Sequence, residues 1–357
     1  MHKLLPVMTR PAAAIAVAAT VAAAMAVQAT AAPDGPQPRQ TAQATLQNGV
    51  LRVDGTSADD AIALRLQAGD VQVDLGDDRT PDFSFPAADV TAIDVRAGNG
   101  DDAVRVDQTT GAFAIPTTID GGNGNDKLTG GAANDILVGG NGDDDLSGGA
   151  GTDTLRGDNG NDTIDGNVGN DLQFGGSGDD SFVWNPGEGS DTIEGQTGSD
   201  ALLFNGAAVD EQVTLSANGN RLSFFRVQAN ITMDTAGVER VDFNALGGAD
   251  LVVVDDLSGT DVREVNVDLA GALGGDRGDG QHDHVIVNGT NGDDSVDIAG
   301  DAGSLSVGGL AATVNVLHTD GANDRLDVNT FGGKDSVESG GLAAGSIELF
   351  VNGALVA

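Results

Sequence analysis

The chain of 357 residues contains no cysteine and no tyrosine, and it has a single tryptophan and four histidines. Without cysteine it can form neither a disulfide nor a thiolate metal site, so another interaction must stabilise it. Basic side chains are scarce too, because 17 Lys and Arg stand against 55 Asp and Glu, a formal charge of -38. This charge argues against nucleic acid and anionic membranes as partners, and it suits a protein that collects divalent cations.

Signatures of catalysis are also missing from the sequence. It contains no G-x-S-x-G elbow, no cysteine nucleophile, no H-E-x-x-H helix and no EF-hand loop. His282 and His284 could bind a transition metal as a pair, but no third ligand is evident, and a solvated turn is the favoured interpretation. His318 is isolated. We therefore expect no catalytic residue, although a paired-carboxylate glycosidase stays open because nothing selects or eliminates a pair.

The N-terminus resembles a secretory signal peptide over residues 1–31. A basic start precedes an Ala/Val-rich run that ends in the small-x-small site Ala29-Thr30-Ala31. The alternative is a retained membrane anchor, which the short and weakly hydrophobic run disfavours. Residues 32–48 are rich in Pro, Gln and Ala and are expected to be a linker. The sequence thus predicts a secreted protein without a membrane span after signal cleavage.

A nonapeptide repeats seven times from residue 121, and its first copies read GGNGNDKLT, GGAANDILV and GGNGDDDLS. The first column is always Gly, and the eighth is apolar except at Gln173. The sixth column is always aspartate: Asp126, Asp135, Asp144, Asp153, Asp162, Asp171 and Asp180. Such regularity is not typical of the alternative, a disordered Gly/Asp-rich linker.

Each repeat can form a six-residue turn, because its glycines tolerate positive φ, followed by a three-residue strand with one inward apolar side chain. Two repeats, 18 residues, would then close one coil of a solenoid. Asp126 would stack over Asp144, Asp162 and Asp180 on one edge, and Asp135 over Asp153 and Asp171 on the other. Carboxylates ~4.8 Å apart repel by roughly 3 to 4 kcal/mol at an effective dielectric constant of about 20, so a cation must lie between them.

The repeat resembles the RTX, or hemolysin-type, calcium-binding nonapeptide G-G-x-G-x-D-x-U-x. Hard oxygen ligands favour Ca²⁺ over Mg²⁺ and over soft metals, so several Ca²⁺ ions are the expected cofactor. The resemblance implies a β-roll in which the sixth-column aspartates and turn carbonyls from two adjacent turns hold each ion. The implied carbonyl ligands belong to Gly122, Gly124, Gly131, Gly140, Gly142, Gly149, Gly151, Gly160, Gly169 and Gly178.

Both flanks of the repeat block contain short alternating strands between acidic turns, such as Ile62/Leu64, Val71/Val73 and Val104/Val106. Residues 90–111 align without a gap to residues 238–259, and residues 51–64 align to residues 285–298. We therefore predict one all-β, right-handed parallel β-roll or β-solenoid rather than three globular domains. Its parts are an N-terminal flank (49–119), the calcium-binding block (120–206) and a C-terminal flank of degenerate repeats (207–357).

Three further aspartates, Asp102, Asp191 and Asp200, are weaker metal candidates. Asp102 occupies a near-complete repeat in the N-terminal flank. Asp191 and Asp200 follow two additional residues, Trp184 and Asn185, and are therefore expected to lie off the 18-residue register. The lone Trp184, beside Phe182, is expected to be a core residue.

The sequence as a whole predicts a secreted calcium-binding protein whose repeat block folds when Ca²⁺ binds. Two alternatives stay open: a calcium-stabilised surface adhesin or matrix protein with an extracellular partner, and a polysaccharide-acting β-helix enzyme. The enzyme would need a groove with a basic residue beside two close carboxylates. The adhesin would need an exposed apolar or aromatic patch on residues 207–357.

Overall fold

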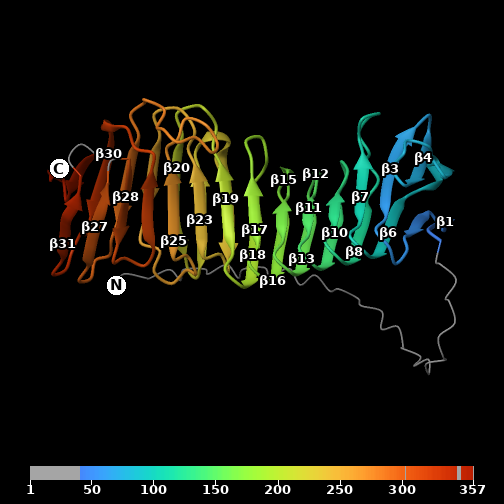
Figure 1. Ribbon diagram of the computed structural model, residues 1–357, viewed down its shortest axis with the longest axis horizontal. Coiled ribbons are helices and arrows are strands. Elements are labelled where there is room, and N and C mark those ends of the chain that lie inside the picture. Colours follow the sequence, from blue (N-terminus) through green and yellow to red (C-terminus); the bar gives the residue numbers. More distant parts are fainter. Residues whose placement is uncertain (1–40, 302, 344–346, 357) are drawn as a thin grey trace, which may run out of the picture. The chain divides into compact units, whose positions relative to one another are not determined.

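The computed structural model describes residues 41–301, 303–343 and 347–356, which belong to one compact unit that begins at Gln40. The predicted signal peptide and the linker up to residue 40 lie outside the described residues. Two short 3-10 helices, η1 (Ala87–Asp89) and η2 (Gln228–Asn230), interrupt regular structure that is otherwise β (Figure 1). The all-β prediction is confirmed.

Within the described residues, the strands form two long sheets and one two-stranded sheet. In spatial order, the first sheet contains β1 (Gln43–Gln47), β2 (Val50–Asp54), β6 (Ala92–Asn99), β8 (Thr117–Asn123), β10 (Ile136–Asn141), β13 (Thr154–Asn159), β16 (Leu172–Ser177), β18 (Thr192–Thr197), β22 (Ile231–Ala236), β21 (Arg221–Arg226), β20 (Gln212–Asn218), β24 (Leu251–Val254), β26 (His284–Asn288), β30 (Gly321–Asn329), β32 (Ile347–Val351) and β33 (Ala354–Leu355). The second sheet contains β31 (Ser336–Leu342), β27 (Ser295–Asp301), β28 (Ser304–Gly308), β29 (Thr313–Leu317), β25 (Glu264–Asp268), β23 (Arg240–Asn244), β19 (Ala201–Asn205), β17 (Ser181–Trp184), β14 (Thr163–Asp165), β11 (Asp145–Ser147), β9 (Lys127–Thr129), β7 (Ala103–Asp107), β3 (Ala61–Gln67), β4 (Asp70–Leu75) and β5 (Phe83–Pro86). The small sheet pairs β12 (Ala150–Gly151) with β15 (Val168–Gly169).

The repeat block winds with the predicted 18-residue coil. Each coil contributes one strand to each long sheet, and neighbouring strands pair in parallel. In the first sheet Leu137 is opposite Leu155, and in the second Leu128 is opposite Leu146. Identical columns of the repeat therefore lie directly above one another, which is the arrangement predicted to stack the sixth-column aspartates.

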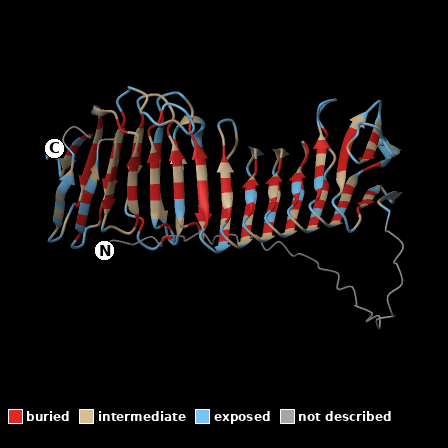
Figure 2. Ribbon diagram, viewed as in Figure 1, coloured by how far each residue is buried: buried red, intermediate tan, exposed pale blue. Residues whose placement is uncertain are grey.

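The core is a stack of eighth-column side chains between the two sheets. Leu128, Leu137, Leu146 and Leu155 are completely buried. Buried and more exposed positions alternate along the strands, as the red and paler bands of Figure 2 show. Gln173, the single polar residue of this column, is buried too. The short strand of each repeat therefore contributes one inward side chain per half coil.

The two-residue insertion at Trp184 does not disturb the stacking of the coils. The prediction that Asp191 and Asp200 lie off the register is therefore wrong for the folded chain. The additional residues lengthen β17 and the turn that follows it, so β16 still pairs in parallel with β18. Trp184 is fully buried, its ring stacks on Phe204 at 4.0 Å, and its indole N–H donates to the Gly189 carbonyl at 2.8 Å. It is a core residue, as predicted.

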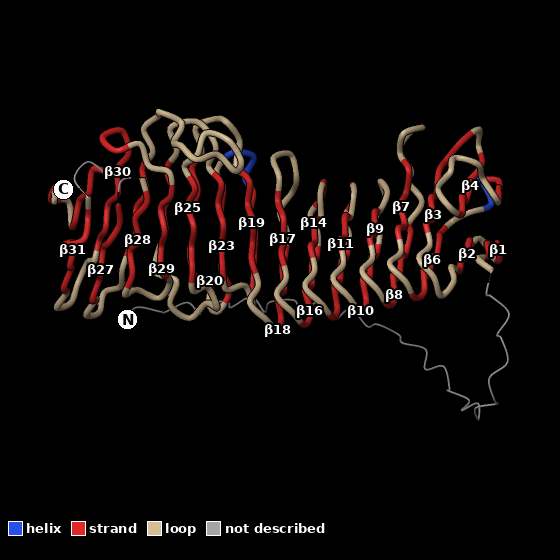
Figure 3. Tube along the Cα trace, viewed as in Figure 1, coloured by secondary structure: helices blue, strands red, loops and turns tan. Residues whose placement is uncertain are grey.

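The flanks continue both sheets, but antiparallel hairpins interrupt their coils. β3 and β4, predicted as successive solenoid strands, pair antiparallel, and β20–β21–β22 and β27–β28–β29 do the same. Figure 3 shows longer connections beside β19, β20, β23 and β25 than beside β9, β11 and β14. The predicted linker is also too long, because β1 begins at Gln43 and pairs antiparallel with β2.

The aligned copies of the flanks have an unexpected placement. Residues 90–111 run from β6 in the first sheet to β7 in the second, whereas residues 238–259 run from β23 in the second sheet to β24 in the first. The same strand-turn-strand unit therefore forms the turn at either edge of the fold. The chain can place acidic turns on both edges with one local sequence pattern.

Candidate metal centre

The sixth-column aspartates form two ladders, one along each edge where the chain passes between the sheets. In the first ladder the Asp126 backbone N–H donates to Oδ1 of Asp144 at 2.7 Å, and Asp144 donates to Asp162 at 2.8 Å. The first ladder contains Asp102, Asp126, Asp144, Asp162, Asp180 and Asp200. The second contains Asp135, Asp153, Asp171 and Asp191. Each carboxylate therefore reaches back to the preceding coil, and the three weaker candidates belong to the same ladders.

One oxygen of most ladder carboxylates has no partner within the described residues. All ten ladder side chains are nearly completely buried, with at most 3% of each residue exposed. Oδ1 is used by the neighbouring N–H, but the buried Oδ2 lacks any hydrogen bond in Asp102, Asp126, Asp144, Asp153, Asp162, Asp171, Asp180 and Asp200. A buried acceptor without a partner is destabilising, and a bound cation would satisfy it.

The two remaining ladder residues are satisfied within the protein. Oδ2 of Asp135 accepts the Gly131 backbone N–H at 2.6 Å, and Oδ2 of Asp191 accepts the side-chain amide of Gln173 at 3.1 Å. A cation would have to compete with these donors. The structure thus separates Asp135, predicted as a full member of the set, from the other sixth-column residues.

The glycines of the repeat allow the carboxylates and carbonyls to approach closely. A Cβ on the first-column Gly157 would collide with Oδ2 of Asp162, so glycine is needed where the carboxylate folds back over its own turn. Fourth-column carbonyls point along the stack, since a Cβ on Gly142 would meet the Gly124 oxygen and one on Gly160 the Gly142 oxygen. In the first ladder, carbonyl oxygens of one turn therefore lie close to the backbone of the next turn.

The carbonyls of the second ladder are partly used by the backbone. Gly131 accepts the Ala150 N–H at 2.9 Å, and Gly149 accepts the Val168 N–H at 2.8 Å, next to the small sheet of β12 and β15. The carbonyls of Gly131 and Gly149 are therefore less available to a cation than predicted. The first ladder is the more favourable edge for cations, because none of its six carboxylate Oδ2 atoms has a hydrogen-bond partner within the described residues.

Burial controls the protonation of the ladder carboxyls. It raises the pKa of Asp144 to about 7, although the hydrogen bond from the Asp126 N–H lowers it. The neighbouring carboxylates of Asp162 and Asp126 raise the pKa further. For the same leading reason the pKa of Asp162 rises to about 6 and that of Asp180 to about 7. A metal-free ladder at neutral pH must therefore either hold protons or bear repelling charges.

The donor set is suited to a hard divalent cation. It consists of buried carboxylate oxygens and backbone carbonyls, and Ca²⁺ accepts six to eight such oxygens in irregular geometry. Within the described ranges no group of three or more His, Cys, Asp or Glu side chains is arranged to hold a metal. A site here would therefore combine two successive carboxylates with carbonyl oxygens. The carboxylates would neutralise the charge of the cation, and the carbonyl oxygens would complete its coordination.

Ladder members outside the repeat columns were missed by sequence reasoning. Asp60 donates its N–H to Asp102 at 2.7 Å, and Asp200 donates to Oε2 of Glu239 at 2.8 Å, so these residues extend the first ladder at its two ends. A similar row in the C-terminal flank contains Glu211, Asp250, Asp283 and Asp324. The alignment of residues 90–111 with 238–259 was a signal for Asp250, but spacings of 33 to 41 residues hide the others.

The histidines are not brought together as a metal pair. His284 contacts Asp327 through its Nε2, whereas Nδ1 of His282 lies 2.9 Å from the Asn323 carbonyl. His318 contacts Asp268 at 2.7 Å. Each ring thus has a separate partner. His282 is exposed before β26, but His284 is the first residue of that strand, so the predicted solvated turn is wrong for His284.

Comparison with known families identifies the repeat block. The family model of the RTX calcium-binding nonapeptide repeat matches residues 117–146, 147–182 and 187–205. The block therefore consists of RTX calcium-binding nonapeptide repeats, and the unmatched residues 183–186 include the Trp184 insertion. A comparison with curated proteins finds no match. Among the described residues, no helix has the length and apolar character needed to cross a membrane.

Replacing Asp144 by Asn should remove a ladder charge while keeping an acceptor for the Asp126 N–H. We expect Asp144→Asn to bind at least one calcium ion fewer, measured by isothermal titration calorimetry. It should also lose about 2 to 3 kcal/mol of calcium-dependent stability at roughly 100 times the dissociation constant. Asp145→Asn is the matched control, because Asp145 is half exposed and pairs with Lys127. Equal calcium stoichiometry in the two variants would contradict the ladder assignment.

The raised carboxyl pKa values predict a pH dependence of the calcium-free fold. Because folding raises the pKa of Asp144 from 3.8 to about 7, the protonated ladder is stable below about pH 4 and loses stability as the pH rises to about 7. Circular dichroism of calcium-free protein across pH 4 to 8 measures this loss. A β signal that stays constant or grows across this range would refute it.

Proposed function

We propose that this protein is a secreted calcium-binding protein whose repeat block folds when Ca²⁺ binds between stacked Gly/Asp turns. The observation that carries the proposal is the row of buried Oδ2 atoms without hydrogen-bond partners in eight ladder aspartates. The RTX repeats over residues 117–205 point to the same ion. Ca²⁺ would meet the unsatisfied oxygens and remove the repulsion between successive carboxylates.

Folding and binding are coupled in this proposal because the site exists only when coils stack. An ion that binds the folded chain and not the unfolded one stabilises the fold by mass action. Extracellular calcium modules typically have dissociation constants of about 10⁻⁴ to 10⁻³ M. Such affinities would leave the block unfolded in a cytoplasm poor in calcium and fold it outside the cell. The sequence pattern of residues 1–31 supports export by the general secretory route.

We also propose that the protein binds rather than catalyses. The ladder carboxylates are buried in turns and accept hydrogen bonds from backbone amides, so a substrate would not reach them in the wound coil. Their chemistry is to hold cations. The scarcity of histidine and the absence of cysteine and tyrosine leave few other groups for proton or group transfer.

The single tryptophan offers a direct test of coupled folding. Trp184 lies in the core at the end of the repeat block, stacked on Phe204, so its emission reports whether the block is wound. Exhaustive chelation at neutral pH should shift the emission to the red and reduce the β signal in circular dichroism. Added Ca²⁺ should restore both at millimolar concentration.

Mg²⁺ at the same concentration is the matched control and should restore neither signal, because it keeps its water ligands and requires octahedral geometry. Unchanged emission and β content after chelation would refute coupled folding. Equal recovery with Mg²⁺ would refute calcium selectivity.

A further inference from the structure

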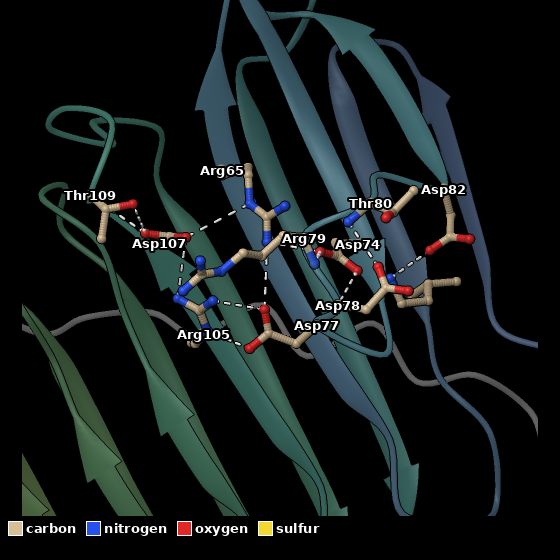
Figure 4. A network of polar contacts seen from close by, with 11 residues as sticks. Arg65, Asp74, Asp77, Asp78, Arg79, Thr80, Asp82, Arg105, Asp107 and Thr109 are labelled. Atoms are coloured by element: carbon tan, nitrogen blue, oxygen red, sulfur yellow. Dashed lines mark hydrogen bonds and ion pairs between the residues drawn. The ribbon is translucent and has the colours of Figure 1, made fainter.

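A hollow of about 470 Å³ in the N-terminal flank gathers three of the 17 basic side chains of this acidic chain. Its lining includes Arg65, Arg79 and Arg105, together with Asp107 and the hydroxyl residues Thr109 and Thr110. The arginines come from β3, from the connection between β4 and β5, and from β7, and Figure 4 shows their side chains beside one another. Three positive groups and one negative group therefore line the hollow.

Two of the arginines are held in fixed positions by carboxylates behind the hollow. Arg65 donates through Nη2 to Asp74 at 2.8 Å, and Asp74 is completely buried. Arg105 binds Asp77 with two hydrogen bonds of 2.7 Å (Figure 4). Because these ion pairs fix the guanidinium groups before any ligand arrives, little conformational entropy would be lost on binding.

Donors toward the hollow are left over after this pairing. Arg65 is 5% exposed, its buried Nε makes no hydrogen bond, and Oδ2 of Asp107 lies 3.7 Å away. The exposed Arg79 makes no ion pair within the described residues. Its backbone N–H donates to Asp74 at 2.7 Å, which fixes its position in the loop. The lining therefore includes one buried N–H without a hydrogen bond and one guanidinium without an ion pair among the described residues.

The carboxylates of the cluster are unsuited to proton transfer. The Arg105 guanidinium lowers the pKa of Asp77, and hydrogen bonds from Thr109 lower the pKa of Asp107. Both groups stay ionised at neutral pH, so neither can act as a general acid. The hollow thus has basic residues beside one lining carboxylate, Asp107, and a second carboxylate, Asp77, behind it, but the chemistry of both favours binding.

We propose that this hollow binds an oxyanion, a carboxylate or sulfate group on a small or sugar-sized ligand. Guanidinium groups bind such anions with paired, charge-assisted hydrogen bonds. The volume falls within the range of small-molecule sites. With a formal charge of -38 the chain repels anions over most of its length, so the guanidinium of Arg79, beside the Arg65 Nε that lacks a hydrogen bond, would select where an anion binds. This site is separate from the calcium ladders and does not depend on them chemically.

The test is a titration of the calcium-saturated full protein with inorganic sulfate and with glucuronate, followed by NMR of the arginine Nε–H groups. We expect saturable shifts of the Arg65 and Arg79 signals with at least one probe. A response to glucuronate alone identifies a carboxylate ligand, and a response to sulfate alone identifies a sulfated one. No saturable shift with either probe would overturn the proposal.

Arg79→Gln is the informative variant, because Arg79 has no ion pair whose loss could unfold the hairpin. It should weaken binding about tenfold, the size expected for one lost charge-assisted contact. Arg277→Gln is the matched control, since the Arg277 side chain is 89% exposed in another loop. Equal affinities of the two variants would also overturn the proposal. The calcium titration of both variants should be unchanged, which distinguishes this site from the ladders.

Discussion

The structure depends on one interaction that repeats along both edges: a buried aspartate accepts a backbone N–H from the preceding coil while its second oxygen has no protein partner. The Asp126–Asp144 contact of 2.7 Å is one example. The hydrogen bond fixes the register of the coils, and the unsatisfied oxygen makes the wound form costly at neutral pH. The same residue therefore fixes the register of the coils and carries an unsatisfied buried oxygen, which is the basis of the proposal that a cation completes the fold.

The remaining columns of the repeat follow from this arrangement. Glycine stands in the first column because the carboxylate folds over it, and in the fourth because a carbonyl of the adjacent coil approaches. Leucine in the eighth column fills a core only one side chain deep per half coil. Such a thin core gives little hydrophobic stabilisation to offset the conformational entropy of a glycine-rich chain. The C-terminal flank packs two further buried aromatic residues, Phe224 and Phe243, against Phe204 of the repeat block.

The sequence predicts the repeat block well because a nine-residue period fixes both the partner and the face of every residue. In the flanks, alternation at Val71 and Val73 identifies the buried face but not the neighbouring strand, so the hairpin was missed. The connection Ala68-Gly69, with φ of +55° and +92°, was its local signal. The satisfied oxygens of Asp135 and Asp191 could not be predicted, since their donors Gly131 and Gln173 acquire that role only through the turn geometry and the stacking of coils. The arginine hollow likewise unites residues 40 positions apart, Arg65 and Arg105, which share no motif.

The central claim is that a divalent cation lies between successive ladder carboxylates. The most direct measurement is X-ray diffraction from crystals grown in saturating Ca²⁺, with anomalous difference maps at a long wavelength. The account predicts peaks along the first ladder, each within about 2.3 to 2.6 Å of a ladder carboxylate oxygen such as Oδ2 of Asp126 or Asp144. Wound coils with no anomalous peak beside these oxygens would contradict it.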